Sequence, residues 1–358
     1  MKKTYPKVLL TDEALRDGLQ IEREGVTLEE KLEVLNLLMD AGIKRMMVGA
    51  FVSPKWSPQM ADTVELIKRL KPRQGVQLFA LALNERGREM VRAHSDLLST
   101  DPTPISLRHM CNVFMQRNTN KTAEDQERTW RMPIEQASAA DATKAGIALS
   151  EPWGSNWTGP TTREARLATL QLQFDAWAGA GIEVKRVSLF DPMSWSQPHI
   201  VAEDLRAIKA RWPSITEFHL HLHNGRGMAL LSVYEALSIL GDRDTLIIDT
   251  ALGGIGGCPY CGNGQATGMI PTEEFVQLLQ TLGIDIGVDI RQLINANHRL
   301  SQILGRRLHS QVSLNGALPG AEQLYAEDIP AIYTFEQAQH FRLGASVYEG
   351  NPRPWVRR

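Results

Sequence analysis

The segment Phe218-His-Leu-His-Leu-His-Asn-Gly-Arg-Gly227 contains the most informative spacing in this chain. Its histidines, His219, His221 and His223, alternate with leucines. Alternate residues of a β-strand project from one face, so this spacing directs the imidazoles to one side and the leucines to the other. Neighbouring imidazoles at the carboxyl end of a strand are typical of a metal site. The alternative is an imidazole row held by hydrogen bonds in the core.

Strand-like apolar runs alternate with segments of helical period on both sides of this histidine strand. The predicted strands cover residues 8–12, 43–48, 76–82, 105–107, 147–150, 184–190, 218–223 and 246–249, with 96–98 as an alternative for the fourth. The predicted helices cover 27–40, 62–70, 85–93, 122–145, 163–180, 199–212, 228–240 and 273–282. Open doubly wound sheets rarely reach eight strands, so the pattern predicts an α/β fold of the (β/α)8 TIM-barrel type.

Two local signals support these helices. Thr27 and Glu30 have the spacing of a capping box at a helix start. Pro133 is expected to interrupt the long helical segment 122–145, because proline lacks a backbone donor.

The length of 358 residues exceeds what a barrel needs, which is commonly about 250 residues. We predict a catalytic barrel over residues 1–285 and a C-terminal, mainly helical extension over 286–358 that packs on the barrel.

The composition narrows the class of protein. Hydrophobic residues make up 43% of the chain and charged residues 22%, with a formal net charge of −2. These values indicate a large core, and no basic run favours nucleic acid as a partner. No apolar stretch approaches the roughly 18 residues of a membrane span, so no membrane partner is expected. Three cysteines do not make a disulfide framework and fit a cytoplasmic protein.

Arg16 and Asp17 directly follow the first predicted strand. Such a pair is usually a surface ion pair, but the carboxyl ends of barrel strands all meet at one mouth. Asp17 is therefore expected to lie opposite the histidine strand. One carboxylate with two imidazoles is a frequent open site for a divalent metal, and this mixed set does not single out one metal.

The eighth predicted strand leads into a glycine-rich loop over residues 251–260, which carries Cys258. Four glycines within five positions permit close backbone approach to a ligand and movement of the loop. Cys258-Pro-Tyr-Cys261 also matches the redox tetrapeptide of glutaredoxins. Its late position in a large barrel favours a loop thiol serving the barrel site over dithiol exchange or a zinc knuckle. Cys111 has the properties of an inert small hydrophobe.

Four separated blocks resemble 3-hydroxy-3-methylglutaryl-CoA lyase and its relatives among the metal-dependent acyl-CoA lyase and acyltransferase barrels. The similarity runs over about residues 8 to 310, and the blocks are Arg16–Gln20, Phe51–Asp62, His221–Gly227 and Gly253–Tyr260. The resemblance implies a (β/α)8 barrel whose Mg²⁺ or Mn²⁺ is bound by Asp17, His221 and His223. Arg16 would stabilise the enolate oxygen, and Cys258 would be the mobile-loop thiol of proton transfer. We predict that Arg16, Asp17, His221 and Cys258 carry the catalysis.

The chain departs from the family pattern at two positions. Met47 stands where the family has a glutamate, and Met269 stands where it has an asparagine ligand. Asn263 is our predicted replacement ligand. Tryptophans in the loops after the fifth and sixth strands indicate a substrate other than the standard one, or they simply pack on the barrel rim. The predicted substrate-binding residues are Gln20, Glu151, Trp153, Asp191, Trp195 and Arg226.

These observations predict a divalent-metal lyase that cleaves a 3-hydroxy acid, or its CoA thioester, by retro-Claisen or retro-aldol chemistry. One alternative is a condensing acyltransferase, although Gly225 replaces an aspartate that is usual in condensing relatives. Another is a binding protein that has lost catalysis. The family resemblance implies a homodimer.

Overall fold

The computed structural model describes residues 3–71, 73–261, 268–321, 324 and 333–335. Among these residues, no helix is both long enough and apolar enough to cross a membrane. Asn263, the predicted replacement ligand, lies outside the described residues.

Eight parallel strands form one curved sheet in the order β3-β2-β1-β10-β9-β8-β5-β4. This order is the cyclic order of a (β/α)8 barrel, so the predicted fold is confirmed. Between the described residues of β3 and β4 no ladder is formed, and this pair is the seam of the barrel. The strands are β1 (Lys7–Asp12), β2 (Arg45–Ala50), β3 (Gln77–Leu81), β4 (Ile105–His109), β5 (Lys144–Ser150), β8 (Glu183–Asp191), β9 (Glu217–Leu222) and β10 (Thr245–Thr250).

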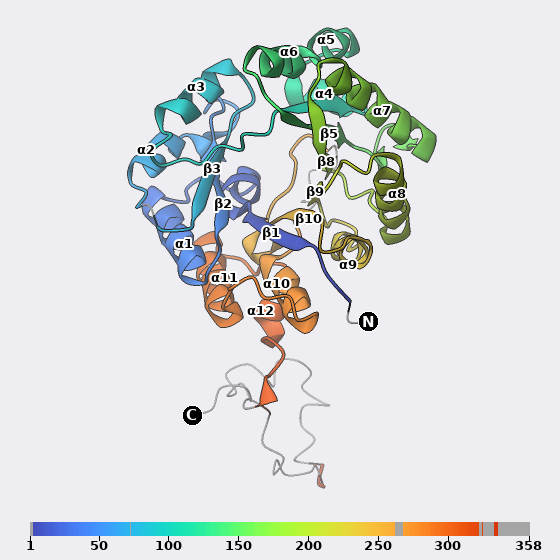
Figure 1. Ribbon diagram of the computed structural model, residues 1–358. Coiled ribbons are helices and arrows are strands. Elements are labelled where there is room, and N and C mark those ends of the chain that lie inside the picture. Colours follow the sequence, from blue (N-terminus) through green and yellow to red (C-terminus); the bar gives the residue numbers. More distant parts are fainter. Residues whose placement is uncertain (1–2, 72, 262–267, 322–323, 325–332, 336–358) are drawn as a thin grey trace.

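Helices surround this sheet in a ring, which Figure 1 shows. A short hairpin, β6 (Gly154–Ser155) and β7 (Gly159–Pro160), extends the loop after β5, and short helical turns are η1 (Ala14–Gly18), η2 (Pro58–Met60) and η3 (Leu252–Gly254). The ring helices are α1 (Leu28–Asp40), α2 (Thr63–Lys68), α3 (Glu85–Ala93), α4 (Asn112–Thr119), α5 (Ala123–Thr129), α6 (Met132–Ala139), α7 (Arg163–Gly179), α8 (Pro198–Arg211), α9 (Ala229–Ile239) and α10 (Thr272–Thr281).

Local sequence signals set several helix ends. The predicted capping box is present, since the Glu30 N–H donates to the Thr27 hydroxyl and the Thr27 N–H donates to the Glu30 carboxylate. The helical segment predicted over 122–145 is interrupted near Pro133 as expected, but its predicted end at residue 145 is wrong. It is divided into α5 and α6, and Pro133 lies in the first turn of α6, where its missing N–H costs nothing. Lys144 already belongs to β5.

The strand register places one row of side chains inside the barrel mouth. His221 of β9 pairs with Phe190 of β8 and with Asp249 of β10. Phe190 pairs with Ser150 of β5, and Ser150 pairs with His109 of β4. Paired residues of parallel strands share a face, so these five side chains form one inner layer. On the other face of β9, Phe218, Leu220 and Leu222 are at most 1% exposed and join the core against the helices.

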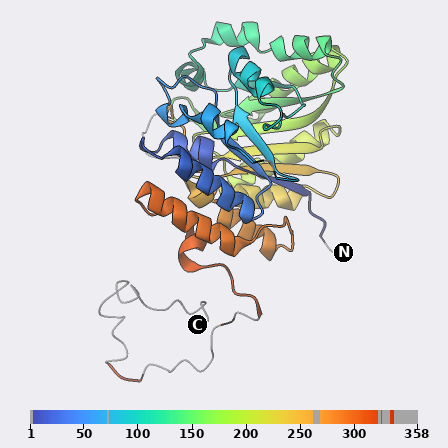
Figure 2. The ribbon, with the colours of Figure 1, turned by 90° about the vertical axis from the view of Figure 1, so that its left-hand side faces the viewer.

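Two further helices, α11 (Ile290–Leu304) and α12 (Gln311–Asn315), follow the barrel. Figure 2 shows both beneath the barrel, with α11 beside α1. The Asp289 N–H donates to the Ala41 carbonyl at 2.8 Å, and Leu293 and Leu300 are buried. Helical packing on the barrel thus agrees with the expected extension, whereas the domain boundary at residue 285 stays a prediction.

The buried carboxylate of Glu273 connects this extension to the glycine-rich loop. It accepts hydrogen bonds from the Gly253 N–H at 3.0 Å, from Asn297 of α11 at 2.6 Å and from Ser313 of α12 at 2.9 Å. Burial, with the nearby Glu274 carboxylate, raises the pKa of Glu273 to about 8. The root of the loop and the extension therefore share one titratable group.

We predict that the stability of this junction depends on pH. Because the native state keeps a proton on Glu273 that the unfolded chain loses near its ordinary pKa of about 4.5, stability falls as the pH rises toward 8 and then levels off. Thermal unfolding should show the wild-type Tm falling by roughly 5 °C more than that of Glu273→Gln between pH 5 and pH 9. Parallel curves for the two proteins would contradict this assignment.

Candidate active site

A single π-helical turn places Arg16 and Asp17 at the mouth. It begins directly after β1, and the Gly18 N–H donates to the Glu13 carbonyl five residues earlier. Such turns occur mostly at functional sites, because the extra residue reorients the side chains. Here Asp17 is 4% exposed.

Arg16 joins two carboxylates in a buried ion-pair network. Its Nε donates to Glu13 Oε2 and its Nη1 donates to Asp17 Oδ2, both at 2.8 Å. Burial opposes ionisation of Asp17, but the charge of Arg16 and the imidazoles of His223 and His221 outweigh it and lower the pKa of Asp17. Asp17 is therefore an ionised carboxylate at neutral pH, as a metal ligand must be.

The imidazoles of β9 are oriented by Asp249 of β10. The Oδ2 atom of Asp249 lies 3.0 Å from His221 Nδ1 and 2.8 Å from His219 Nε2. The Nε2 atom of His221 is 3.2 Å from Nε2 of His223, which in turn is 3.9 Å from Asp17 Oδ1. The ring nitrogens of His221 and His223 therefore face each other beside the Asp17 carboxylate.

Asp17, His221 and His223 fit a divalent cation. One ligand-type atom of each residue lies within 4.8 Å of the other two. Burial lowers the pKa of His223 to about 4 against the opposing charge of Asp17, so this imidazole is neutral and able to bind a metal. His221 shows the carboxylate–histidine arrangement that orients metal ligands, since Asp249 occupies its second nitrogen. The structure thus brings together the three predicted ligands.

The glycine-rich loop passes directly over this cluster. The Gly257 N–H donates to Asp17 Oδ1 at 3.1 Å. Gly256 has a φ of +126°, and a Cβ there would lie 2.9 Å from both Asp17 Oδ1 and Met269 Cγ. Both the backbone conformation and the close approach therefore require glycine at position 256.

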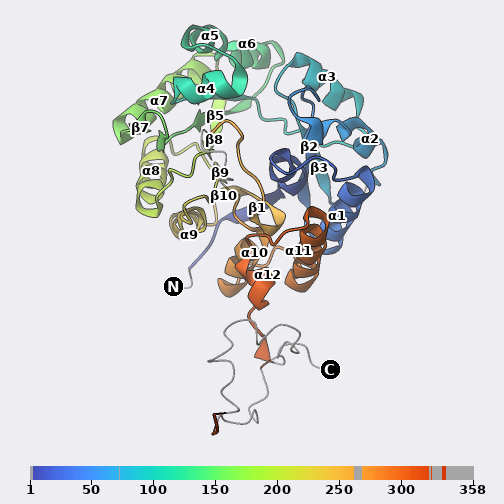
Figure 3. The same cartoon turned by 180° about the vertical axis from the view of Figure 1, so that it is seen from behind.

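Cys258 lies where the loop crosses toward the far side of the mouth. Figure 3 shows the segment after β10 running toward β5 and β8. Its far end is fixed there, because the Cys261 carbonyl accepts from Asn156 at 3.0 Å and the Cys261 thiol donates to the Pro192 carbonyl. Cys258 is half-buried beside an apolar cluster that we call the tryptophan wall: Cys111, Phe114, Trp157, Met193, Trp195, Tyr260 and Cys261.

Two predicted substrate-binding residues lie at this wall. The guanidinium of Arg226 is 5.5 Å from the ring centre of Trp195 and donates to the carbonyls of Met193 and Ser194. The Trp195 indole donates to Asn156. Arg226 therefore fixes the loop after β8, which positions the Trp195 ring.

Two other predicted substrate-binding residues make their contacts away from the cluster. Trp153 is 3% exposed, and its indole donates to Asp204 of α8 behind the sheet. The Asp191 carboxylate accepts the N–H groups of Trp195 and Ser196, so it orders the loop. Gln20 lies just after η1 and is half-buried, and its role in substrate binding stays a prediction.

The departures from the family pattern are visible in the site. Met269 is 1% exposed, and its backbone forms an isolated bridge with His223. It therefore packs under the loop at the position where the resemblance predicts an asparagine. Met47 of β2 contributes no ionisable group to its strand.

Glu13, Asp249 and His109 are at the site but were not predicted from the sequence. Each lies at or just beyond the carboxyl end of a strand, and that position was the available signal. Glu13 also lies three residues before Arg16, a spacing that permits a helical ion pair.

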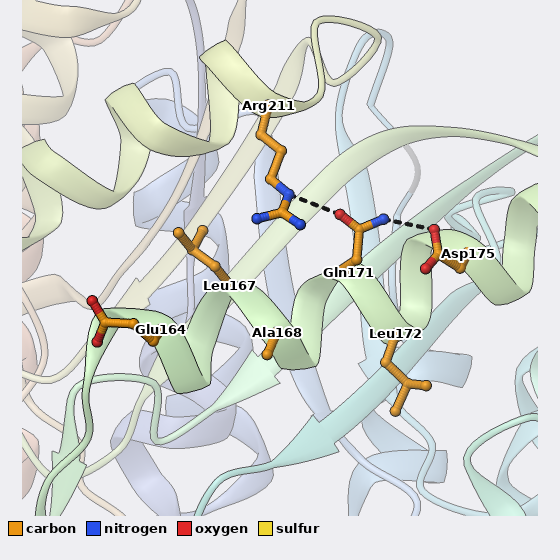
Figure 4. Close-up of a pocket in the computed structure, with 7 residues that line it drawn as sticks. All are labelled: Glu164, Leu167, Ala168, Gln171, Leu172, Asp175 and Arg211. Carbon is orange, nitrogen blue, oxygen red and sulfur yellow. Dashed lines mark hydrogen bonds between the residues drawn. The ribbon is translucent and has the colours of Figure 1, made fainter.

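A separate hollow lies on the outer surface between α7 and α8, away from the strand ends. Figure 4 shows Gln171 hydrogen bonded to Arg211 and to Asp175 across it. The hollow is lined by Glu164, Leu167, Ala168, Gln171, Leu172, Asp175 and Arg211, and it contains no cluster of metal-ligand type.

Residues 7–299 match the HMGL-like family model, which covers all eight strands and the site just described. The chain belongs to the HMGL-like family. The match ends inside α11, so it includes part of the helical extension.

Relatives in this family are named as lyases. The chain is 31% identical to (R)-citramalyl-CoA lyase from Chloroflexus aurantiacus over 325 residues, covering 86% of this chain and 95% of the relative. It is 29% identical to 3-hydroxy-3-isohexenylglutaryl-CoA/hydroxymethylglutaryl-CoA lyase from Pseudomonas aeruginosa, covering 84% and 94%. The crystal structure of hydroxymethylglutaryl-CoA lyase from Pseudomonas aeruginosa superposes with a TM-score of 0.69 at 27% identity, covering 87% and 97%. This family member is a carbon–carbon lyase.

We predict that Asp17→Asn and His223→Gln each weaken Mn²⁺ binding by about 100-fold or more, because each removes one of three ligands. Isothermal titration calorimetry on the purified protein measures this.

The matched control is His219→Gln on the same strand. His219 bonds to Asp249 but lies outside the Asp17 cluster, so this variant should lose less than about tenfold in Mn²⁺ affinity. Equal losses for all three variants would show that the cluster is not the metal site.

Proposed function

We propose that this protein is a divalent-metal-dependent lyase that cleaves a 3-hydroxyacyl-CoA ester between its second and third acyl carbons. The observation that supports this most directly is the convergence of Asp17, His221 and His223 within 4.8 Å at the strand ends, with Arg16 bonded to Asp17. A carboxylate and two imidazoles suit Mg²⁺ or Mn²⁺ with coordination positions left for substrate oxygens.

This reaction needs three forms of assistance. The tertiary hydroxyl must lose its proton, the thioester must accept an electron pair as an enolate, and that enolate must then be protonated. A bound Mg²⁺ or Mn²⁺ supplies Lewis-acid polarisation of the hydroxyl and carbonyl oxygens.

Arg16 is suited to stabilising the enolate. Its Nε donates to Glu13 and its Nη1 donates to Asp17, and these two bonds fix the plane of the guanidinium. The side chain is 13% exposed at the mouth. A fixed donor aimed at a developing oxyanion contributes about 3 kcal/mol of transition-state stabilisation.

Cys258 is suited to proton transfer to the enolate carbon. It is a free thiol, half-buried on the loop whose Gly257 N–H contacts Asp17. This contact of the neighbouring residue supports a role for Cys258 as the proton donor of the loop.

The acyl group that we propose for the substrate differs from the methylglutaryl group of the standard family substrate. The loops after β5 and β8 contribute Trp157 and Trp195 to the tryptophan wall. The lyase relatives named above differ in their acyl groups, so the family accommodates different chains in one barrel. We propose a branched or larger 3-hydroxyacyl chain that packs against this wall.

We also propose a cellular compartment, an oligomeric state and a domain boundary. Three free cysteines support a reducing, cytoplasmic compartment. A homodimer, and a barrel that ends near residue 285, rest on the family resemblance and the chain length.

The direct test is turnover of a panel of 3-hydroxyacyl-CoA esters by protein loaded with Mn²⁺. We expect one or more members to yield a shorter acyl-CoA and a keto product, detected by mass spectrometry. A protein that binds one equivalent of Mn²⁺ yet condenses these products instead of cleaving the ester would favour the acyltransferase alternative.

Replacement of Cys258 separates its chemistry from metal binding. Cys258→Ala should keep Mn²⁺ affinity within about threefold and lower kcat by roughly 100-fold or more, because only proton transfer is lost. Cys111→Ala is the control, since Cys111 is a buried thiol of the wall and should retain most of kcat. A Cys258→Ala variant with full turnover would remove the thiol from the mechanism.

A further inference from the structure

The inner layer of the barrel holds a second polar pair, away from the metal-ligand cluster. His109 ends β4, and Glu151 directly follows β5. The Nδ1 atom of His109 lies 3.2 Å from Glu151 Oε1. The register places His109 in the same inner layer as Ser150, Phe190 and His221. This pair therefore faces the same mouth, three strands from the metal ligands.

Glu151 is held in one orientation. Its carboxylate accepts from the Cys111 N–H at 3.2 Å and from the hydroxyl of Ser150, and its side chain is fully buried. Its φ is +55°, a left-handed conformation that residues other than glycine rarely adopt. Both oxygens of this strained, buried carboxylate are hydrogen bonded to neighbouring residues. Glu151 therefore holds its partner His109 in a fixed orientation.

His109 is also fixed from its other sides. The side chain of Gln126 accepts from the His109 N–H at 2.8 Å, and the Phe114 ring lies 6.2 Å from the imidazole. The side chain of His109 is 10% exposed. Within the described part of the chain, Nε2 of His109 has no recorded partner. His109 thus has one hydrogen-bonding position left open, on a ring that the strand register places on the inner face of the barrel.

We infer that His109 binds a second carboxylate on the acyl chain of the substrate, and that Glu151 positions it for this purpose. A carboxyl group and imidazole Nε2 can form a hydrogen bond with one proton between them, and either group can carry that proton. A carboxyl ligand therefore suits both the protonated and the neutral ring. The inference rests on the proposed function, because it assumes that the acyl-CoA enters this mouth.

The separation of the two polar sites fits such a substrate. Neighbouring strands are about 4.8 Å apart, so β4 and β9 lie roughly 14 Å apart along the sheet, and inward side chains shorten this gap. A thioester end at the metal cluster therefore leaves the distal end of a short acyl chain near His109. The tryptophan wall offers mainly apolar surface, so a hydrogen bond from His109 would favour a charged chain end over an apolar one.

The test is a binding measurement that needs no turnover. Glutaryl-CoA and pentanoyl-CoA have the same carbon count, and only the first carries a terminal carboxylate. Calorimetry with Mn²⁺-loaded wild type should show glutaryl-CoA binding about tenfold or more tightly, as expected for one hydrogen bond to a charged group. His109→Phe should remove this preference by losing affinity for glutaryl-CoA alone.

Further variants distinguish ligand binding from a structural role. Glu151→Gln should reduce the preference partly, and His109→Gln should retain part of it, since glutamine still donates a hydrogen bond. His94→Phe is the control, because His94 is a half-buried histidine on the far side of α3 that bonds to Met90. All variants should keep Mn²⁺ affinity.

The outcomes separate this inference from the proposed function. Equal binding of the two esters by wild type, or an unchanged preference in His109→Phe, overturns the role of His109 even if the enzyme cleaves another ester. A lost preference in His109→Phe supports it even if no panel member is cleaved. If His109→Phe weakens Mn²⁺ binding and both esters together, the pair is structural and the inference is wrong.

Discussion

The hydrogen bond between His221 and Asp249 is the contact on which the geometry of the site depends. The carboxylate occupies Nδ1 of the ring and leaves Nε2 facing Nε2 of His223. This arrangement joins two neighbouring strands, so a metal-binding orientation on β9 is fixed by a residue of β10. The same oxygen of Asp249 holds His219, which lies deeper and stays outside the ligand set. Three histidines with equal spacing therefore acquire different roles.

Charge balance explains why this polar layer suits a dication. Glu13, Asp17 and Asp249 are buried around one guanidinium, that of Arg16. When both imidazoles are neutral, as metal ligands must be, the three ionised carboxylates exceed the guanidinium by two negative charges. Burial raises the pKa of Glu13, and the charges of Asp249 and Asp17 add to the effect of burial. A divalent cation at the Asp17 cluster would offset this excess and remove the cost of burying unpaired charge.

The glycine-rich loop connects the metal-ligand cluster to the helical extension. One end of the loop is attached to Glu273, which also holds Asn297 and Ser313 of the added helices. The middle contacts Asp17 through Gly257, and the far end is fixed to the loops after β5 and β8. Movement at the mouth is therefore limited at both ends by contacts outside the metal cluster. Helices α11 and α12 are thus connected through Glu273 to the loop that contacts Asp17.

The sequence by itself determined the barrel and predicted that Arg16, Asp17 and two histidines of one strand lie at the same mouth. Period-two and helical patterns, together with strand ends that share one edge, depend only on local spacing, which a sequence displays directly. Only the tertiary structure decided the contacts of Asp249, Glu151 and His109, because each has a partner from a neighbouring strand of the sheet. Trp153 is a further residue whose position could not be predicted from the sequence. Its loop reaches the mouth, but its partner Asp204 lies on α8, and packing against that helix turned the indole away from the substrate.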